Sequence, residues 1–396
     1  MQLTKKQAQG LAIAIERYRH GEPYTCIAGY AGTGKSTLVR FIIEALELDP
    51  QDVAYVAFTG KAAKVLRDKG NPGAITAHKL LYEFQFNRAD MTYTAYPRLP
   101  GNLDGDYKLI VVDEVSMLPK TMWNLLLSHG IYVIACGDPA QLSPVSNDFN
   151  DVLQHPHVFL DEIMRQALDN EIIRFSMDIR NHKPLKPYKG QQVQILPKKE
   201  LCDGMLFWAD QVLCATNNTR FYLNDRYRQI LWKEQYSQNP LIGDKIIGLK
   251  NDWKLLTHAG EPFTNGTLCN IVNIDATNNS YYGGKKMYFD LLPVQYDVND
   301  VEIYDLYAFQ NILIDYKLLT KNVPLVSKQN YSFHKKNMPH EVAYGYAITT
   351  WKAQGSEFNK VLLLEENFPF DKEERWRYLY TGITRASEKA IIILNK

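Results

Sequence analysis

The chain has 396 residues, of which 45% are hydrophobic and 22% charged, a composition typical of a globular protein with roughly two to four domains. Its 45 basic and 44 acidic side chains give a net charge of +1, which excludes a basic coat protein and restricts any nucleic-acid contact to a local groove. The N-terminus lacks the apolar segment of a signal peptide, and no apolar run reaches membrane-spanning length, so we expect a cytoplasmic protein.

The five cysteines argue against a zinc site, because none of them belongs to a C-x-x-C pair. Several fall in apolar runs that are typical of buried strands, so we expect reduced core residues. They are Cys26, Cys136, Cys202, Cys214 and Cys269.

The first predicted element is a helix over the amphipathic residues 8–18, with Thr4 as its N-cap. Taken alone, Gln7 is better explained as a surface residue of this helix. A carboxamide can also donate to and accept from the N6/N7 edge of adenine. The position of Gln7, about 20 residues before a glycine-rich loop, suits this second role.

Residues 29–36 satisfy the pattern G-x-x-x-x-G-K-[ST] of a P-loop, with an apolar strand predicted before them and a helix after them. Glycines let backbone N–H groups surround a phosphate at a helix N-terminus. A simple glycine turn before a helix would not require Lys35 and Ser36 in register. We therefore predict that a nucleoside triphosphate binds at Gly32, Thr33, Gly34, Lys35, Ser36 and Thr37, with Lys35 on the β- and γ-phosphates and Ser36 on Mg²⁺.

A second apolar strand, over residues 109–112, ends in the adjacent carboxylates Asp113 and Glu114, the form of a Walker B segment. We expect Asp113 to hold Mg²⁺ through water and Glu114 to orient and deprotonate the attacking water. A solvated strand end is the weaker alternative, because two buried acids are costly unless a cation compensates them. Gln141 follows a further buried strand, where it can sense the γ-phosphate.

Strand and helix signals alternate over residues 24–145, which predicts a doubly wound parallel sheet, and they start again near residue 166. Two segments interrupt this α/β pattern. Residues 82–106 place aromatic side chains on either side of a polar tip and predict a β-hairpin that is either a surface flap or a functional tool. Residues 241–335 contain short strands with Asn/Gly turns and predict a small β-barrel. The α/β pattern is then expected to resume at residues 341–348.

Ten segments, taken in order, resemble the motifs of superfamily 1 helicases, specifically the RecD/Dda-like group that moves 5′ to 3′ on single-stranded DNA. The resemblance covers nearly the whole chain, and the compact size is similar to that of phage members, so we expect a phage or mobile-element origin. The segments are Gln7, the P-loop, residues 58–64, 76–80, 113–117, 137–142, 164–166, 215–218, 346–357 and 380–386.

The resemblance implies two RecA-like domains with ATP and Mg²⁺ in the cleft between them. The first would comprise residues 1–81 and 107–166, and the second residues 167–240 and 336–396. The insertion at 82–106 would be the pin that splits the duplex. The insertion at 241–335 would be an SH3-like β-barrel beside the DNA path.

The resemblance also implies roles in the nucleotide site. Gln7 would read adenine, Gln141 would sense the γ-phosphate, and Arg165 and Arg385 would be arginine fingers. Taken alone, either arginine would more often be a surface residue. Gly355 and Glu357 would contact phosphate and ribose.

The positions that resemble the DNA contacts of the family are Thr59, Lys61, His78, Thr349, Trp351 and Lys352. Hydroxyls and lysines suit phosphates, and aromatic faces suit bases. Taken alone, His78 would more often be a structural residue. Trp351 replaces the histidine that is usual in the family, so we expect base stacking or domain packing there, with a purely structural role equally open.

The leading expectation is therefore a monomeric, DNA-stimulated ATPase that moves 5′ to 3′ and unwinds duplex DNA, in the bacterial host cytoplasm if phage-encoded. Its partners would be single-stranded DNA, junctions of single- and double-stranded DNA, and a single-strand binding protein or other replication and recombination proteins. The alternatives are a single-strand translocase that displaces proteins but unwinds poorly, and a P-loop switch without motor activity. RNA stays open as a substrate.

Overall fold

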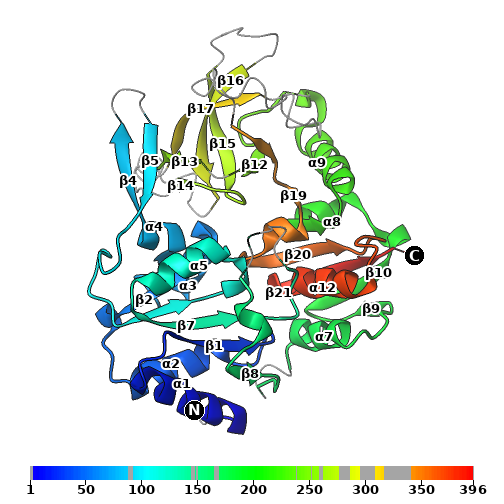
Figure 1. Cartoon of the computed structure of the whole chain (residues 1–396). Coiled ribbons are helices and arrows are strands. Elements are labelled where there is room, and N and C mark those ends of the chain that lie inside the picture. The colour runs from blue at the N-terminus through cyan, green and yellow to red at the C-terminus, as the bar shows by residue number, and fades with distance from the viewer. Residues whose placement is uncertain are drawn as a thin grey trace. The chain divides into compact units, whose positions relative to one another are not determined.

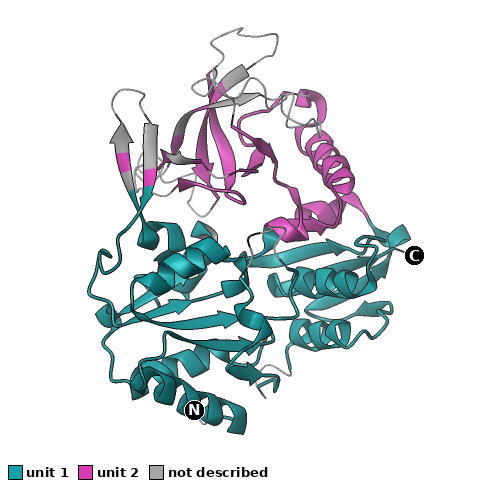
Figure 2. Cartoon of the chain, in the orientation of Figure 1, with its two compact units in different colours: residues 1–83, 96–201, 353–396 teal, residues 84–95, 202–352 magenta. Residues whose placement is uncertain are grey.

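The computed structural model describes residues 3–87, 92–143, 148, 150–164, 169–237, 239–250, 252–257, 262–275, 286–294, 308–315 and 340–395. The chain packs into two compact units, with residues 1–83, 96–201 and 353–396 in unit 1 and residues 84–95 and 202–352 in unit 2 (Figure 2). Unit 1 contains residues expected in both RecA-like domains, and those domain boundaries stay predictions.

Unit 1 contains a six-stranded sheet in the order β3-β2-β6-β7-β1-β8, and every neighbouring pair of strands runs parallel (Figure 1). This confirms the α/β class and the parallel sheet predicted from residues 24–145. The strands are β1 (Tyr24–Gly29), β2 (Val53–Ala57), β3 (Ile75–Thr76), β6 (Leu109–Val112), β7 (Tyr132–Gly137) and β8 (Val158–Leu160).

Helices cover both faces of this sheet, which is why its strands are apolar on both sides. Ile27 and Leu109 pack with residues of α1 and α2 in one core, whereas Cys26 and Ile110 pack with residues of α4 and α5 in another. The helices of this part of the chain are α1 (Lys5–Arg19), α2 (Lys35–Ala45), α3 (Gly60–Asp68), α4 (Ala77–Leu81) and α5 (Lys120–Ser128).

The start of α1 follows the sequence prediction. Thr4 is the N-cap, its hydroxyl accepts a hydrogen bond from the Gln7 backbone N–H, and the Gln7 side chain accepts one from the Thr4 N–H. This reciprocal capping box fixes the orientation of the Gln7 side chain at the first turn.

A second sheet in unit 1 places β20, β21 and β10 side by side in parallel, with β9 antiparallel at the edge. Two helices accompany it and pack against each other. The elements are β9 (Tyr188–Lys189), β10 (Val193–Pro197), β20 (Phe358–Leu364), β21 (Ala386–Leu394), α7 (Glu171–Arg180) and α12 (Lys372–Ile383).

Unit 2 contains a parallel pair of strands, β11 and β19, and an antiparallel sheet in the order β17-β16-β15-β12-β18. Its elements are α8 (Asp203–Trp208), β11 (Gln211–Cys214), α9 (Asn217–Trp232), β12 (Lys245–Gly248), β13 (Asp252–Leu256), β14 (Pro262–Phe263), β15 (Leu268–Asp275), β16 (Lys286–Pro293), β17 (Phe309–Asp315), β18 (Val342–Tyr344) and β19 (Ala347–Thr349). An SH3-like barrel over 241–335 stays a prediction.

Two further strands, β4 (Tyr82–Asn87) and β5 (Thr92–Pro97), pair within the segment predicted to be a hairpin. Residues 88–91, its expected tip, lie outside the described residues. The role of this segment as a pin stays a prediction. Among the described helices, none is long and apolar enough to cross a bilayer.

The α/β pattern expected to resume at residues 341–348 resumes only after Gly345, because the structure divides this segment between two sheets. Val342–Tyr344 pairs with β12 in the antiparallel sheet, whereas Ala347–Thr349 pairs with β11 in parallel. A Cβ atom at Gly345 would lie 2.9 Å from Leu268 Cδ2 and 3.0 Å from the Ile246 carbonyl carbon. Glycine therefore allows the close approach of the backbones where the chain passes from one sheet to the other.

A buried ion pair holds unit 2 together. The side chains of Arg228, on α9, and Asp244, before β12, are 1% and 0% exposed, and Arg228 Nη2 lies 3.0 Å from Asp244 Oδ2. Asp244 also accepts hydrogen bonds from Trp232 Nε1 at 2.9 Å and the Tyr346 hydroxyl at 2.9 Å. The carboxylate thus joins α9, the start of β12 and the segment between β18 and β19.

We predict that Asp244→Asn lowers the free energy of unfolding by about 3–5 kcal/mol, because it leaves the buried Arg228 guanidinium without a counter-charge. Urea unfolding followed by circular dichroism measures the change. The matched control is Asp203→Asn, which breaks the exposed ion pair of Asp203 with Arg226 on the same helix and should leave stability nearly unchanged. Equal effects of the two substitutions would contradict the role assigned to Asp244.

Candidate active site

The P-loop connects the carboxyl end of β1 to α2, and two of its glycines have left-handed backbone angles. Gly32 and Gly34 have φ angles of 76° and 78°, which side-chain-bearing residues rarely adopt. A Cβ atom at Gly34 would lie 2.5 Å from both Gln7 Nε2 and Met164 Sδ. The loop therefore requires glycine there for its backbone conformation and for the close approach of its neighbours.

Lys35 begins α2 and folds back along the loop, where its Nζ donates to the carbonyls of Gly29 at 2.7 Å and Tyr30 at 3.1 Å. Thr33 is 1% exposed and donates its hydroxyl to the same Tyr30 carbonyl at 2.8 Å. Ser36 is exposed in the first turn of α2, followed by the half-buried Thr37. The lysine ammonium, the Ser36 hydroxyl and the helix N-terminus together suit a phosphate chain.

Gln7 is 1% exposed, so it is not the surface residue that sequence alone favoured. Its Nε2 donates to the carbonyls of Thr33 at 3.3 Å and Gly34 at 3.4 Å. Its position against the P-loop suits a residue that reads the base of a bound nucleotide, and this role stays a prediction.

Asp113 and Glu114 follow the carboxyl end of β6. Glu114 has φ and ψ angles of 49° and 51°, a left-handed conformation that costs a non-glycine residue on the order of 1–3 kcal/mol and is often found at functional sites. Burial raises the pKa of Asp113, the Glu114 carboxylate raises it further, and the Lys35 charge lowers it. The Oε2 atom of Glu114 is buried without a hydrogen-bond partner.

Arg385 comes from the turn between α12 and β21, yet it contacts the carboxylate that follows β6. Its Nη1 lies 3.1 Å from Glu114 Oε1, and it donates to the carbonyls of Ser356 and Thr381, each at 3.2 Å. The residue is 5% exposed. The fold therefore brings together a predicted arginine finger and the predicted general base. Arg165, the other predicted finger, lies outside the described residues.

Gly355 lies beside the same carboxylate. It has a φ angle of 68°, and a Cβ atom there would lie 3.3 Å from Glu114 Oε2 and 3.5 Å from Thr59 Oγ1. Glu357 forms an ion pair with Lys69 at 2.7 Å. The structure thus places Gly355 beside the Glu114 carboxylate, while the catalytic role of Glu114 and the phosphate and ribose roles of Gly355 and Glu357 stay predictions.

The loop after β7 is joined to α12 and to the segment that contains Gly355. The Leu142 N–H donates to the Thr381 hydroxyl at 2.8 Å, and Gln354 Nε2 donates to the Leu142 carbonyl at 2.6 Å. Gln141, the predicted phosphate sensor, is half-buried in this loop. Leu142, the residue after Gln141, is therefore hydrogen-bonded both to α12 and to the segment that contains Gly355.

Tyr380 is a site residue to which the sequence assigned no role. Its hydroxyl accepts a hydrogen bond from the Ala31 N–H of the P-loop at 3.0 Å and donates one to Asp138 Oδ2 at 2.5 Å. Burial raises the pKa of Asp138, which the Lys35 charge opposes. The only signal in the sequence was that Tyr380 belongs to the same motif as Arg385, and the contact itself depends on the tertiary fold.

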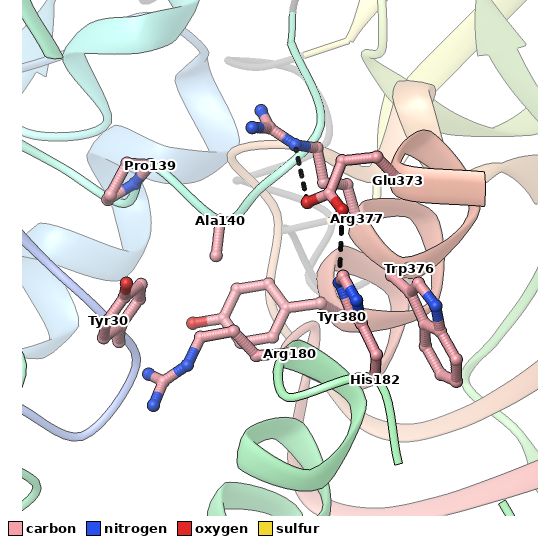
Figure 3. A pocket seen from close by; sticks show the side chains of 9 residues that line it. All are labelled: Tyr30, Pro139, Ala140, Arg180, His182, Glu373, Trp376, Arg377 and Tyr380. Carbon is pink, nitrogen blue, oxygen red and sulfur yellow. Dashed lines mark ion pairs between the residues drawn. The ribbon is translucent and has the colours of Figure 1, made fainter. Parts of the chain in front are cut away.

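A pocket of about 270 Å³ adjoins the P-loop (Figure 3). The Arg180 guanidinium, at the end of α7, lies 3.6 Å from the centroid of the Tyr30 ring, a cation–π contact with the P-loop. On α12, Trp376 stacks on His182, with ring centroids 5.3 Å apart. The lining residues are Tyr30, Pro139, Ala140, Arg180, His182, Glu373, Trp376, Arg377 and Tyr380. The P-loop thus contacts α7 through Arg180 and α12 through Tyr380.

The predicted DNA contacts of unit 1 lie near the carboxyl ends of β2 and β3. Thr59 caps α3 by accepting from the Ala62 N–H at 3.1 Å, and Lys61 is in the first turn of that helix. His78 is 8% exposed between Phe58 and Tyr82, and burial lowers its pKa to about 3. The imidazole is therefore neutral at physiological pH, and a charged contact with a phosphate does not suit it.

The predicted DNA contacts of unit 2 follow β19. Thr349 is the last residue of the strand, and Trp351 and Lys352 lie in the short helical turn after it. All three side chains are half-buried. Their exposed parts are available to a ligand, and their contacts with DNA stay predictions.

Within unit 1, a glycine loop between a parallel strand and a helix, acidic residues at the end of a second strand and an arginine from a distant motif define a P-loop NTPase. Two family models match the chain, an AAA domain over residues 2–196 and a UvrD-like helicase C-terminal domain over residues 344–393.

Curated relatives match both halves. The ATP-dependent DNA helicase Dda of Enterobacteria phage T4 is 24% identical over 97% of this chain and 97% of its own length. The ATP-dependent RecD2 DNA helicase of Deinococcus radiodurans is 25% identical over 98% of this chain and 49% of its own length. The structure of Bacteroides Pif1 helicase with ADP-AlF3 and single-stranded DNA aligns over 100% of this chain and 93% of Pif1, with 17% identity and a TM-score of 0.50, and supports the fold.

The family models and the curated relatives confirm the resemblance to superfamily 1 helicases of the RecD/Dda-like group that the order of the motifs predicted.

We predict that His78 makes stability depend on pH. Below about pH 6.5 the unfolded chain protonates this histidine, whereas the folded chain, with a pKa of about 3, does not. Stability should therefore fall with pH, and this residue should contribute a loss of about 2 kcal/mol between pH 7.5 and pH 5. Urea unfolding at both pH values should show a smaller loss for His78→Phe than for the wild type.

The control for this experiment is His20→Gln, because His20 is exposed at the end of α1. This variant should keep the pH dependence of the wild type. If His78→Phe also kept it, the burial of a neutral His78 would be refuted.

Proposed function

We propose that the chain is an ATP-dependent DNA helicase that moves 5′ to 3′ on single-stranded DNA and unwinds duplex DNA. The observation that carries the proposal is the 3.1 Å contact between Arg385 Nη1 and Glu114 Oε1. An arginine beside the predicted general base suits a P-loop protein that hydrolyses its nucleotide, because such an arginine can stabilise the charge of the transition state. The names of Dda and RecD2 as ATP-dependent DNA helicases support the same function.

The residues of the site suit ATP hydrolysis. Lys35 would leave the loop carbonyls for the β- and γ-phosphates, and Glu114 would accept a proton from the attacking water. Arg385 would release Glu114 and bind the γ-phosphoryl group. This exchange would free Glu114 to act as the base, and Arg385 would then stabilise the charge of the transition state. Gln141 would report the presence of the γ-phosphate to Leu142 and its neighbours.

The site also suits Mg²⁺, because Ser36 and Asp113 offer the hard oxygen ligands that this ion prefers. The unpartnered Glu114 Oε2 adds a further acceptor beside them. The described residues contain no cluster of three or more His, Cys, Asp or Glu side chains arranged around a metal, and a site that shares Mg²⁺ with phosphates does not need one. When bound, the ion would neutralise charge on the β- and γ-phosphates.

Hydrolysis would move the DNA-binding segments through the contacts of α12. Tyr380 and Thr381 connect this helix to the P-loop and to the loop after β7, so loss of the γ-phosphate would shift α12. Thr59, Lys61 and His78 would contact the strand from unit 1. Thr349, Trp351 and Lys352 would contact it from unit 2. Alternate release of the two groups would advance the strand, with one nucleotide per ATP as the simplest step.

The partners of the proposed activity are single-stranded DNA and junctions of single- and double-stranded DNA. A single-strand binding protein and other proteins of replication, recombination or repair are further candidates. We propose that the chain acts as a monomer.

Two alternative functions predict different results in assays of ATP hydrolysis and of duplex unwinding. A translocase that displaces proteins would hydrolyse ATP with DNA but unwind poorly. A P-loop switch would bind ATP without stimulation by DNA.

We predict that single-stranded DNA stimulates ATP hydrolysis and that duplexes with a 5′ tail are unwound faster than those with a 3′ tail. Lys35→Ala should abolish both activities, because it removes the charge on the β- and γ-phosphates. The control is Arg40→Ala, an exposed change on the same helix. No stimulation by DNA would refute the motor, and unwinding only from a 3′ tail would refute the polarity.

We further predict that Arg385→Gln lowers kcat for ATP by on the order of 10³-fold, with a much smaller change in KM, because the finger acts mainly in the transition state. Arg385→Lys keeps the charge and should recover part of the loss. Lys372→Gln, an exposed change on α12, is the control and should keep near-normal kcat. A normal kcat in Arg385→Gln would exclude Arg385 from the reaction.

A further inference from the structure

A cluster of positive charge lies in unit 2 at the edge where β11 and β19 end. The two strands are parallel, and Cys214 lies opposite Thr349, so their carboxyl ends meet. Helix α9 starts directly after β11, with Thr216 as its N-cap. Asn224 ties α9 to β19, because its Nδ2 donates to the Ala347 carbonyl at 2.8 Å and its Oδ1 accepts from the Ala347 N–H at 3.0 Å. We call this the β11–β19 edge.

Arg220, in the first turns of α9, is the central residue of the β11–β19 edge. It is 5% exposed, and its Nε is buried without a hydrogen-bond partner. Its guanidinium lies 4.6 Å from the centroid of the Phe221 ring, and no carboxylate of the described residues forms an ion pair with it. Burial lowers the pKa of Arg220. A buried cation without a counter-charge is unfavourable, and no described residue neutralises the charge of Arg220.

The turn after β19 adds a second cation and a hydroxyl. Burial, and then the charge of Arg220, lower the pKa of Lys352 to about 8, against the opposing effect of Glu341. Glu341 is itself engaged in an ion pair with Lys250. Thr350, in the same turn as Lys352, is fully buried, and its hydroxyl has no hydrogen-bond partner.

These groups share one chemical preference. Two cations, an unpartnered hydroxyl and the N-terminus of a 16-residue helix all favour an anion with several oxygen atoms. By contrast, the charge of Arg228, which lies on the same helix, is neutralised by Asp244. The β11–β19 edge therefore differs from a structural ion pair in lacking its negative partner.

We propose that the β11–β19 edge binds a backbone phosphate of the single strand, and that Arg220 is a phosphate-binding residue of the motor together with Thr350 and Lys352. This inference rests on the proposed function. It adds a residue of α9 to the contacts expected from the motif at 346–357. A free phosphate ion has the same chemistry, so the experiment must separate the two sources.

The experiment measures the affinity of the full chain for a fluorescent oligo(dT) over a range of salt concentrations. Each phosphate contact on a single strand contributes about 0.7 to the slope of log K against log salt. Arg220→Gln should therefore lower the slope by about 0.7 and weaken binding about fivefold at about 0.1 M salt. Arg220→Lys should keep most of the slope. Arg226→Gln, an exposed change on the same helix, should behave as the wild type.

A second measurement needs no substitution. Lys352 should react with an acetylating reagent faster than ordinary lysines at pH 7.5, because its lowered pKa leaves more of the free amine. Oligo(dT) should protect it, whereas inorganic phosphate at the same ionic strength should not. Equal protection by inorganic phosphate would assign the site to a free anion and overturn the proposal.

An unchanged salt slope in a folded Arg220→Gln variant would also overturn the proposal while leaving the helicase function intact. If the wild type itself failed to bind oligo(dT), the proposed function would fail first. The acetylation result decides the matter if Arg220→Gln does not fold.

Discussion

The site depends on two adjacent carboxylates placed where the protein interior makes negative charge expensive. Asp113 and Glu114 end a strand that is buried on both faces, and burial raises the pKa of Asp113. Cations must therefore reach this strand end from elsewhere in the chain. Lys35 comes from the adjacent loop, and Arg385 comes from a position 271 residues further along. Glu114 has a left-handed backbone, and its side chain forms an ion pair with Arg385. The attraction in this ion pair offsets part of the cost of the strained backbone.

The parallel sheet provides the geometry that this compensation needs. Strands β1, β6 and β7 are neighbours with the same direction, so the P-loop, the acidic pair and Gln141 all follow carboxyl ends at one edge. The contacts of Tyr380 and Thr381 then connect α12 to two of these three loops. Because Arg385 follows α12 directly, the position of the arginine and the conformation of the P-loop are parts of one hydrogen-bonded network. A ligand that takes Arg385 from Glu114 must act on that network as a whole.

Sequence alone predicted the parts of this arrangement that local rules determine. The P-loop glycines, the apolar strand before Asp113 and the capping of α1 by Thr4 all follow from spacing and side-chain chemistry within a few residues. The break at Gly345 was missed, because an apolar run does not tell which of two sheets each half joins. The role of Gln7 was ambiguous, because the pattern of an amphipathic helix does not show whether a glutamine is buried against another element. For Tyr380 the only signal was its place in the motif of Arg385, and for Arg220 there was no signal, because the contacts of both residues depend on the tertiary fold.

The net charge of +1 does not show that charged side chains are paired at one site of the chain and lack a counter-charge at another. At the candidate nucleotide site, Glu114 forms an ion pair with Arg385 within the protein. At the β11–β19 edge, no carboxylate of the described residues pairs with Arg220, and Lys352 donates to the neutral Asn265 side chain, whereas Asp244 accepts hydrogen bonds from several donors. Internal pairing stabilises a fold, whereas an unmatched buried cation lowers its stability unless a ligand supplies the missing charge. A buried arginine without a carboxylate partner among the described residues, on the helix that also carries the fully paired Arg228, therefore fits the proposed phosphate site, in a chain whose net charge of +1 gives no sign of affinity for a polyanion.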